Sequence, residues 1–180
     1  MATVQPIRRI EDLNKLQNIF KSNQRNLLIF LIGINCGLRI SDILALNIND
    51  VVDKEFITIT EVKTKKKRTI PLNNKVKNLI NKFIKDKEIN SPLFINNRDG
   101  KRLSRISAYR ILKQACADVK LKGTFGTHTL RKTFGYHFYK KYNDIVMLQK
   151  ILNHSSPFIT LKYIGITEEE IYKCCIEFEL

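Results

Sequence analysis

Acidic residues are scarce in this chain of 180 residues. Its 17 Asp and Glu stand against 32 Lys and Arg, which leaves a formal charge of +15 and a pI near 9.8. Such an excess of positive charge attracts polyanions, so a nucleic acid is the favoured partner, with a ribosome-associated or membrane-surface role as the alternatives. The acidic charge that exists gathers at one end: residues 164–180 hold five Glu and one Lys, whereas residues 1–163 carry +19.

Long apolar runs are absent as well. The longest covers residues 27–34, which is too short to cross a bilayer, and the first residues contain no apolar signal segment. The four cysteines lack the C-x-x-C spacing of zinc sites, and because two are adjacent they do not suit a disulfide framework. We therefore expect a cytoplasmic protein without membrane contact, without a bound metal, and with reduced, buried thiols at Cys36, Cys116, Cys174 and Cys175.

No internal repeat, low-complexity stretch or interdomain linker interrupts the sequence. With 43% hydrophobic residues, the chain is long enough to bury one core and too short for two. We expect a single domain over residues 1–180.

Apolar residues recur at helical spacing along most of the chain, which predicts a mainly α-helical fold. Alternating, β-branched residues at 56–62 and 68–72 predict two strands joined by a charged turn at 63–67, so the fold class is mainly α with a small antiparallel β-sheet (α+β). We expect Gly37 to end the second helix in a left-handed conformation, which places Arg39 at the entrance of the third. The expected helices cover residues 10–21, 27–34, 40–46, 74–87, 104–119, 128–141, 145–152, 156–163 and 168–177.

Two arginines and a histidine are candidates for holding a phosphate. Cutting a phosphodiester requires a nucleophile, positive charge on the non-bridging oxygens, and a proton for the departing 5′ oxygen. The planar, permanently charged guanidinium groups of Arg39 and Arg131 can each give a phosphate two parallel hydrogen bonds. The spacing of His128 and Arg131 puts both side chains on one face of a helix at its N-terminal turn, where backbone N–H groups favour an anion.

A lysine, a second histidine and a tyrosine complete the candidate set. Lys63 begins the charged turn, and neighbouring positive charge favours a lowered pKa and hence proton donation. His154 precedes Pro157, which is expected at the first position of a helix, and its imidazole can donate to phosphate. Tyr163 follows nine positions later, and its phenol needs cations nearby to attack as a phenolate. His137 is interpreted as a packing or solvent-facing helix residue.

The order and spacing of these residues resemble the tyrosine recombinase (phage integrase) family, from about Asn26 to the end of the chain. The resemblance is carried by Gly37-Leu38-Arg39-Ile40-Ser41-Asp42, by His128-Thr129-Leu130-Arg131, and by the segment from Leu152-Asn153-His154 to Tyr163. Asn153 stands where the family usually has Gly, and Asn tolerates the left-handed backbone.

The resemblance implies a mainly helical catalytic domain that needs no cofactor and breaks and rejoins DNA through a covalent 3′-phosphotyrosyl intermediate. It implies that Tyr163 is the nucleophile and Lys63 the general acid, and that Asp42 supports the site from behind Arg39. The side chains that activate and stabilise the phosphate are then Arg39, Arg131, His128 and His154.

The same resemblance implies how the protein meets its partners. Double-stranded DNA is the expected substrate, with nonspecific phosphate contacts from Lys65, Lys66, Lys67 and Arg68. The family assembles as a tetrameric synapse, in places with accessory DNA-bending proteins, and residues 164–180 are expected to dock on a neighbouring protomer. Family members typically carry an N-terminal DNA-clamping domain; here it is expected to be absent, either because this is a catalytic fragment or because the protein is naturally short.

Three activities fit these residues. The leading interpretation is a site-specific recombinase or integrase that mediates integration, excision or recombination, as in mobile elements. A type IB topoisomerase uses related chemistry without a second DNA partner. A DNA-binding regulator with an idle site would bind DNA but has no need of Tyr163, His154 and Arg131 together.

Overall fold

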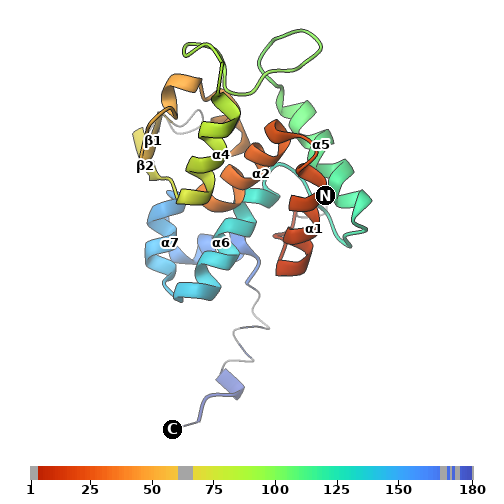
Figure 1. Cartoon of the computed structure of the whole chain (residues 1–180). Coiled ribbons are helices and arrows are strands. Elements are labelled where there is room, and N and C mark those ends of the chain that lie inside the picture. Colours follow the sequence, from red (N-terminus) through yellow and green to blue (C-terminus); the bar gives the residue numbers. More distant parts are fainter. Residues whose placement is uncertain (1–3, 61–66, 167–169, 171, 173–174, 180) are drawn as a thin grey trace.

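The computed structural model describes residues 4–60 and 67–166, together with residues 170, 172 and 175–179. Within them, the fold consists of helices and one β-hairpin, which lies between the third and fourth α-helices in the chain (Figure 1). In chain order the elements are α1 (Ile10–Phe20), α2 (Gln24–Cys36), α3 (Ile40–Ala45), the short 3-10 helix η1 (Ile48–Asp50), β1 (Phe56–Thr60), β2 (Lys67–Pro71), α4 (Asn74–Ile84), α5 (Arg105–Asp118), α6 (Thr129–Tyr142), α7 (Ile145–Leu152) and α8 (Pro157–Ile164).

Helix α2 lies at the centre and contacts α1, α3, α4 and α6 (Figure 1). Its sequence is apolar nearly all round, as expected of a helix covered on every side, and Leu28 and Ile32 are fully buried. The Asn23 side chain accepts a hydrogen bond from the backbone N–H of Asn26 and starts the helix, while Gly37, at φ 60°, ends it. The buried side chains around α2, contributed by α1 to α5, the hairpin and the first turn of α6, form what we call the main core.

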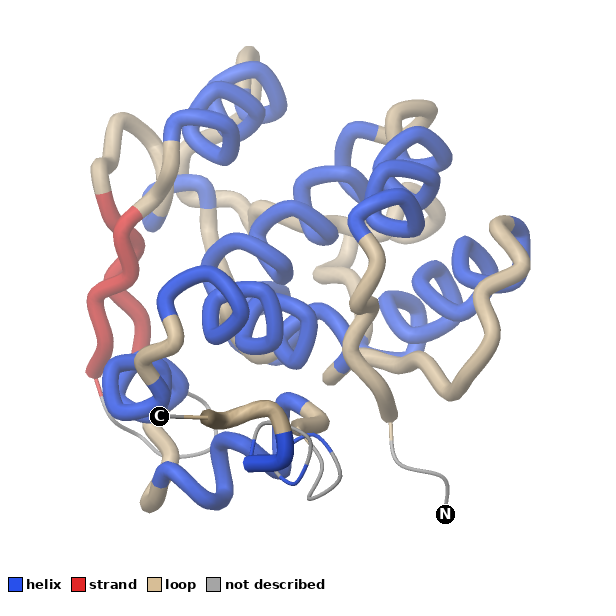
Figure 2. Tube along the Cα trace, turned by 90° about the horizontal axis from the view of Figure 1, so that it is seen from below, coloured by secondary structure: helices blue, strands red, loops and turns tan. Residues whose placement is uncertain are grey.

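The hairpin pairs β1 with β2 in antiparallel register, with Ile57 opposite Ile70 and Ile59 opposite Arg68. The three isoleucines are buried, so one face of this two-stranded sheet joins the main core. Figures 1 and 2 place the hairpin at the edge of the molecule, beside α7. A guanidinium nitrogen of Arg68 donates to the carbonyl oxygen of Ile151 at the end of α7, which fixes the hairpin to this helix.

Helices α6, α7 and α8 enclose a second, much smaller group of buried side chains, Leu148, Leu152 and Ile164, which we call the small core. Partly buried aromatic residues of α6 surround it. Helix α8 approaches α6 closely at Gly135, where an added Cβ would lie 2.7 Å from Cγ2 of Ile164. Any larger residue at position 135 would therefore push the two helices apart.

The residues before α1 cross the molecule as an extended strap. The backbone N–H of Gln5 donates to the Thr124 carbonyl at 2.9 Å, and that of Ile7 donates to Thr133 Oγ1 at 2.9 Å. His137 Nε2 donates to the carbonyl of Ile7 at 2.9 Å, so this histidine packs the strap against α6.

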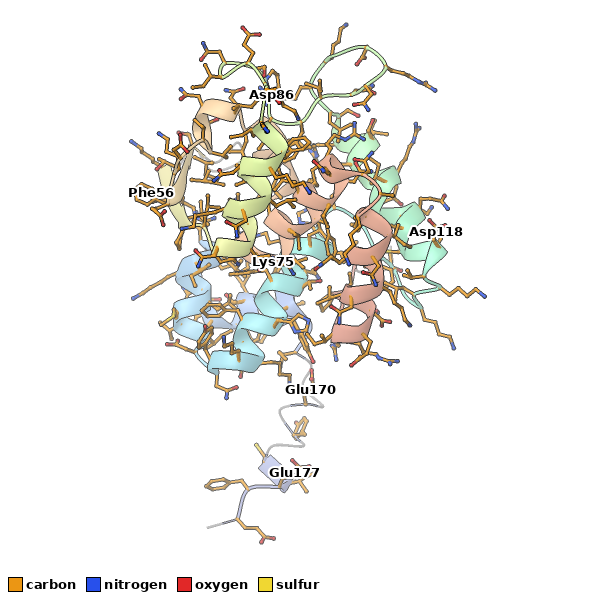
Figure 3. The ribbon with its side chains drawn as sticks, in the orientation of Figure 1. Phe56, Lys75, Asp86, Asp118, Glu170 and Glu177 are labelled. Carbon is orange, nitrogen blue, oxygen red and sulfur yellow. The ribbon has the colours of Figure 1, made fainter. Side chains whose placement is uncertain are left out.

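At the opposite end of the chain, Glu177 lies further from the body than Glu170 (Figure 3).

The predicted fold class is confirmed, as are the left-handed Gly37 and the position of Pro157 in the first turn of α8. The helix bounds differ from the predicted ones by up to three residues, most at α2, which covers Gln24–Cys36 rather than 27–34, and at α4, which stops at Ile84 rather than at residue 87. After α4 the chain turns, with Asp86 at a φ of 63°. Half of the residues of the predicted helix at 168–177 lie outside the described residues.

The cysteine prediction is confirmed for Cys36 and Cys116, which are buried, and wrong for Cys175, which is exposed; Cys174 lies outside the described residues. Burial raises the pKa of the Cys36 thiol to about 12 and that of Cys116 to about 11. None of the described helices is long and apolar enough to cross a membrane.

Candidate active site

Arg131 is a deeply buried charged residue among the predicted site residues. It lies in the first turn of α6 and is 2% exposed. Its Nη1 donates to the carbonyl oxygen of Gly37 at 2.5 Å, and its Nη2 to that of Leu152 at 2.5 Å. One guanidinium thus joins the end of α2, in the main core, to the end of α7, in the small core. These two bonds leave at most three of its five N–H groups for other partners.

Arg39 enters the same region from the turn between α2 and α3. Left-handed Gly37 reverses the chain, and Arg39 is the N-cap residue of α3 with extended backbone. Its Nη1 lies 3.9 Å from Oδ2 of Asp42, whose side chain is 1% exposed. Asp42 therefore stands behind Arg39 on the same short helix, where a supporting carboxylate was predicted.

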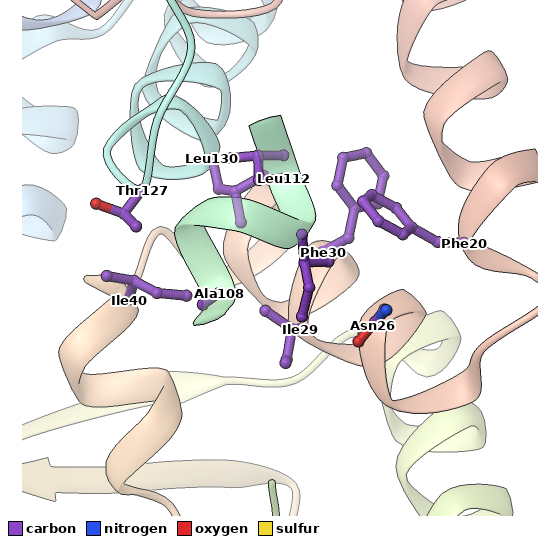
Figure 4. Close-up of a pocket in the computed structure, with 10 residues that line it drawn as sticks. Phe20, Asn26, Ile29, Phe30, Ile40, Ala108, Leu112, Thr127 and Leu130 are labelled. Atoms are coloured by element: carbon purple, nitrogen blue, oxygen red, sulfur yellow. The ribbon is translucent and has the colours of Figure 1, made fainter. Parts of the chain in front are cut away.

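The residues next to Arg39 and Arg131 in the chain are packed in the same part of the main core. Ile40 follows Arg39 and Leu130 precedes Arg131, and both line the same small apolar cavity between α1, α2, α3, α5 and α6 (Figure 4). Leu130 also fits tightly over α2, because a Cβ at Gly33 would lie 2.7 Å from its Cβ. The spacing of the arginines is consequently set by the packing of the main core.

His128 is the N-cap residue of α6, and its Nδ1 lies 3.5 Å from the hydroxyl oxygen of Tyr163. That distance is the outer limit of a hydrogen bond, and such contacts often tighten when substrate binds. Partial burial, followed by the charges of Arg131, Lys132, Arg105 and Arg39, holds the pKa of His128 below its ordinary value of 6.5. The imidazole is therefore neutral at pH 7 and able to accept a proton.

Tyr163 lies near the end of α8, half-buried, with its ring in the small core. Burial raises the pKa of its phenol, because the charged form loses hydration. The positive charges of Arg131 and Arg39, and a hydrogen bond with Arg131, act in the opposite direction. The hydroxyl thus lies within the electrostatic reach of both arginines, which is what a tyrosine nucleophile requires.

His154 is placed by the turn between α7 and α8. Asn153 adopts the left-handed conformation at φ 51°, as predicted, and the backbone N–H of His154 donates to the Gln149 carbonyl at 3.1 Å. The imidazole meets the ring of Tyr163 edge-on, with centroids 4.9 Å apart. Its Nδ1 lies 3.1 Å from Oγ1 of the buried Thr160.

Sequence reasoning missed two neighbours of Tyr163, namely Thr160 and Lys132. Lys132 is 7% exposed, and its ammonium lies 5.1 Å from the centroid of the Tyr163 ring, a cation–π distance. Burial lowers the pKa of this lysine. Its position four residues after His128 on the same helix was a usable signal, since that spacing places both on the face toward Tyr163.

The hairpin carries the remaining predicted residues. Lys63, Lys65 and Lys66 lie outside the described residues, so their predicted roles stay predictions. Lys67 is exposed at the start of β2, whereas Arg68 is half-buried and contacts the Ile151 carbonyl. That contact holds the turn end of the hairpin close to the turn that carries His154. A DNA contact by Arg68 remains a prediction.

Within the part of the chain that the structure describes, no three His, Cys, Asp or Glu side chains gather in a way that could hold a metal ion. The described site instead places two guanidinium groups and two imidazoles around the phenol of one tyrosine. Such a set suits a phosphodiester whose charge must be neutralised while an oxygen attacks phosphorus.

Comparison with known proteins gives the family. The model of the phage integrase family matches residues 8–170. The chain belongs to this family. The prediction of a tyrosine recombinase catalytic domain is thereby confirmed.

Two relatives show how this chain compares with other recombinases. It is 51% identical to the probable integrase/recombinase YoeC of Bacillus subtilis over 170 residues, which cover 94% of this chain and 93% of YoeC. It is 31% identical to the tyrosine recombinase XerC of Thermodesulfovibrio yellowstonii over 150 residues, which cover 78% of this chain and 50% of XerC. The chain thus spans nearly all of YoeC and about half the length of the Xer relatives.

The fold agrees with solved recombinases. The crystal structure of XerH bound to a palindromic difH substrate, a post-cleavage complex, matches with a TM-score of 0.74 at 22% identity, over 94% of this chain and 51% of that one. At this identity the match concerns the fold, which is that of a tyrosine recombinase catalytic domain.

Proposed function

We propose that this chain cleaves and rejoins duplex DNA at specific sites through a covalent 3′-phosphotyrosyl intermediate on Tyr163, and so mediates DNA integration, excision or recombination. One observation carries the proposal. The Tyr163 hydroxyl lies against His128 and within reach of Arg39 and Arg131, although these residues come from three separate helical segments. A protein that only binds DNA has no use for such a convergence.

The first step is activation of the nucleophile. Neutral His128 accepts the phenol proton at Nδ1, and the two arginines favour the phenolate that forms. The Tyr163 oxygen attacks phosphorus, a new P–O bond forms, and the bond to the 5′ oxygen breaks. The departing oxygen takes a proton from Lys63, the residue assigned as general acid through the family resemblance. The reverse sequence, with a 5′ hydroxyl as nucleophile, rejoins the strand.

The arginines and His154 act on the phosphate itself. Charge grows on its non-bridging oxygens as five bonds form to phosphorus, and preorganised donors aimed at these oxygens lower the barrier. Arg131 is held by two backbone carbonyls before any substrate arrives. Arg39 is backed by Asp42, and His154 by Thr160. These positions support phosphate-binding roles for all three.

Double-stranded DNA is the proposed substrate. The charge of +15 supports a polyanionic partner, and the related fold of XerH was solved on its difH substrate. The basic turn, with Lys65, Lys66 and Lys67, is proposed to contact phosphates beyond the cleavage site. Because such contacts release counterions, binding should weaken steeply with salt.

Assembly is a further part of the proposal: protomers pair into a tetrameric synapse on DNA, with accessory DNA-bending proteins where the target requires them, and residues 164–180 dock on a neighbour. Exposed apolar side chains at Tyr172, Ile176 and Phe178 support a docking role. The alternative is a segment that stays on its own body, since Glu170 Oε1 lies 3.9 Å from both Arg8 and Lys140. Unchanged assembly on DNA after deletion of residues 167–180 would rule out docking.

The decisive experiment is a denaturing-gel assay for a covalent protein–DNA adduct on nicked duplexes taken from the sequence flanking the gene. We expect an adduct with the native protein and none with Tyr163→Phe, which should still bind the duplex. Tyr142→Phe is the matched control, because Tyr142 lies exposed at the far end of α6 and should leave the adduct unchanged. Binding without any adduct from the native protein would contradict the proposal, and relaxation of supercoiled plasmid without recombinants would favour a topoisomerase.

A further inference from the structure

Thr160 is a buried polar residue that takes no direct part in the proposed chemistry. It lies in the middle of α8, three positions before Tyr163, and is fully buried. Its Oγ1 makes two contacts: 3.0 Å to the carbonyl oxygen of Ser156, one turn earlier, and 3.1 Å to Nδ1 of His154. Both partners belong to the turn that leads into α8.

The two contacts together determine where the protons lie. A hydroxyl has one proton to donate and lone pairs with which to accept. The Ser156 carbonyl can only accept, so Thr160 donates its proton there, as β-branched hydroxyl residues in helices commonly do toward the carbonyl four positions earlier. Toward His154 the hydroxyl can then only accept, which requires a hydrogen on Nδ1.

We propose that Thr160 is a positioning residue that holds His154 as the Nδ1-protonated tautomer, so that Nε2 is the nitrogen that acts on the scissile phosphate. The role of Nε2 rests on the function proposed above; the tautomer rests on the contacts of Thr160 alone. The hydrogen bond made by one ring nitrogen of a histidine commonly decides the state of the other. With Nδ1–H committed to Thr160, Nε2 accepts a hydrogen bond when the ring is neutral and donates one when it is protonated.

The same contact fixes the orientation of the imidazole. Rotation of the ring would break the hydrogen bond with Thr160, while the edge-on packing against Tyr163 limits tilting. Thr160 and Tyr163 lie one turn apart on α8, and His154 is hydrogen-bonded to Thr160. The positions of His154 and Tyr163 are therefore both set by this helix. A displacement of α8 therefore moves both reacting groups together.

The test reads the tautomer directly, without any DNA. Long-range 1H–15N correlation spectra of the 15N-labelled protein report which nitrogen of each of the three histidines carries a hydrogen, and His154→Gln identifies the His154 signals. We expect Nδ1 of neutral His154 to be protonated in the native protein and in Thr160→Ser, which keeps the hydroxyl. In Thr160→Val, which removes it at nearly constant volume, a substantial population of the Nε2-protonated form should appear.

Thr133→Val is the matched control. Thr133 is also a buried threonine, but its hydroxyl accepts from the Ile7 backbone rather than contacting a catalytic histidine, so the His154 spectrum should not change. An Nε2-protonated His154 in the native protein, or an unchanged tautomer in a folded Thr160→Val variant, would overturn the inference. If Thr160→Val does not fold, the spectra of the native protein and of Thr160→Ser still decide it.

Adduct formation supplies the functional half of the test. Thr160→Val should slow it by roughly tenfold to hundredfold with duplex binding retained, whereas Thr160→Ser should recover most of the rate. A Thr160→Val variant that has changed tautomer but cleaves at the native rate would overturn the role of Nε2. If the native protein forms no adduct at all, the proposed function fails, and the spectra still decide the tautomer.

Discussion

The main core and the small core of this protein differ in size and in what they position. Among the described residues the main core holds thirty buried apolar side chains, and the small core holds three, surrounded by partly buried aromatics. Arg39 is anchored by the main core, whereas Tyr163 packs against the small one and His154 contacts the ring of Tyr163. Arg39 is thus built on the region with more apolar burial, and Tyr163, the proposed nucleophile, on the region with less.

Helix α6 joins the two regions. Leu130 faces the main core, Gly135 packs against α8, and Arg131 bonds to a carbonyl on each side. The difference in burial predicts that the small core opens locally more often than the main core does. Three measurements test that contrast, and a fourth, the pH dependence of cleavage, tests the proposed chemistry.

Replacing Arg131 should have the largest effect, because this side chain joins the two cores. Arg131→Leu leaves the carbonyls of Gly37 and Leu152 buried without their donor, which costs about 4 kcal/mol of unfolding free energy in total. Adduct formation should be lost as well. Urea unfolding followed by circular dichroism checks the stability, and Arg110→Leu, at an exposed position of α5, is the control that should change little. A loss below about 1 kcal/mol would contradict the joining role.

Matched leucine truncations compare the cores directly. Leu28 in α2 and Leu148 in α7 are both 0% exposed. Leu28→Ala should cost about 3 kcal/mol of global stability and Leu148→Ala about 2 kcal/mol, because the small core has more freedom to collapse around the lost atoms. Hydrogen exchange should show faster opening of α7 and α8 in Leu148→Ala, with α2 still protected. Equal loss of protection in both regions would mean that the cores unfold as one unit.

The pH dependence of cleavage tests the proton acceptor. The pKa of His128 lies below 6.5, so His128 stays neutral and active as pH falls through 6.5, and the rate declines only at lower pH, by about tenfold per pH unit. Single-turnover adduct formation between pH 5 and 8 measures this, after duplex binding is shown to be constant over that range. A decline that begins well above pH 6.5 would show that another group limits the reaction.

Thiol labelling compares the accessibility of the cysteines without changing any residue, and we expect it to show the smallest effect of the four measurements. Cys36 and Cys116 belong to the main core, and their raised pKa values, about 12 and about 11, leave almost no thiolate at pH 8. Peptide mapping after iodoacetamide treatment of the folded protein should find Cys175 alkylated and these two intact. Labelling of Cys36 before Cys175 would show that the main core opens far more readily than its burial implies.

Much of the local structure could be predicted because it depends on single residues. Gly37 and Asn153 take the left-handed backbone that their chemistry allows, and Pro157 begins α8. The helices follow from apolar periodicity, although their ends shift by up to three residues where turn geometry decides. The membership of the candidate catalytic set came from motif order, since spacing alone does not place residues 35 positions apart, such as His128 and Tyr163, in contact.

The contacts that define the site could not be predicted. Nothing in the sequence indicates that Arg131 would bond to the carbonyls of Gly37 and Leu152, or that Arg68 would bond to Ile151. Backbone carbonyls at helix ends look alike in sequence, and only the tertiary packing determines which side chain reaches them.

The two carbonyl bonds of Arg131 also determine when its freedom of movement is lost. A free arginine side chain can sample many rotamers, and immobilising one costs up to about 2 kcal/mol in entropy. In this protein that loss occurs during folding, when the guanidinium docks on Gly37 and Leu152. A phosphate that later arrives meets a guanidinium already in place, so little of the binding energy is consumed in ordering it and more remains for lowering the barrier to cleavage.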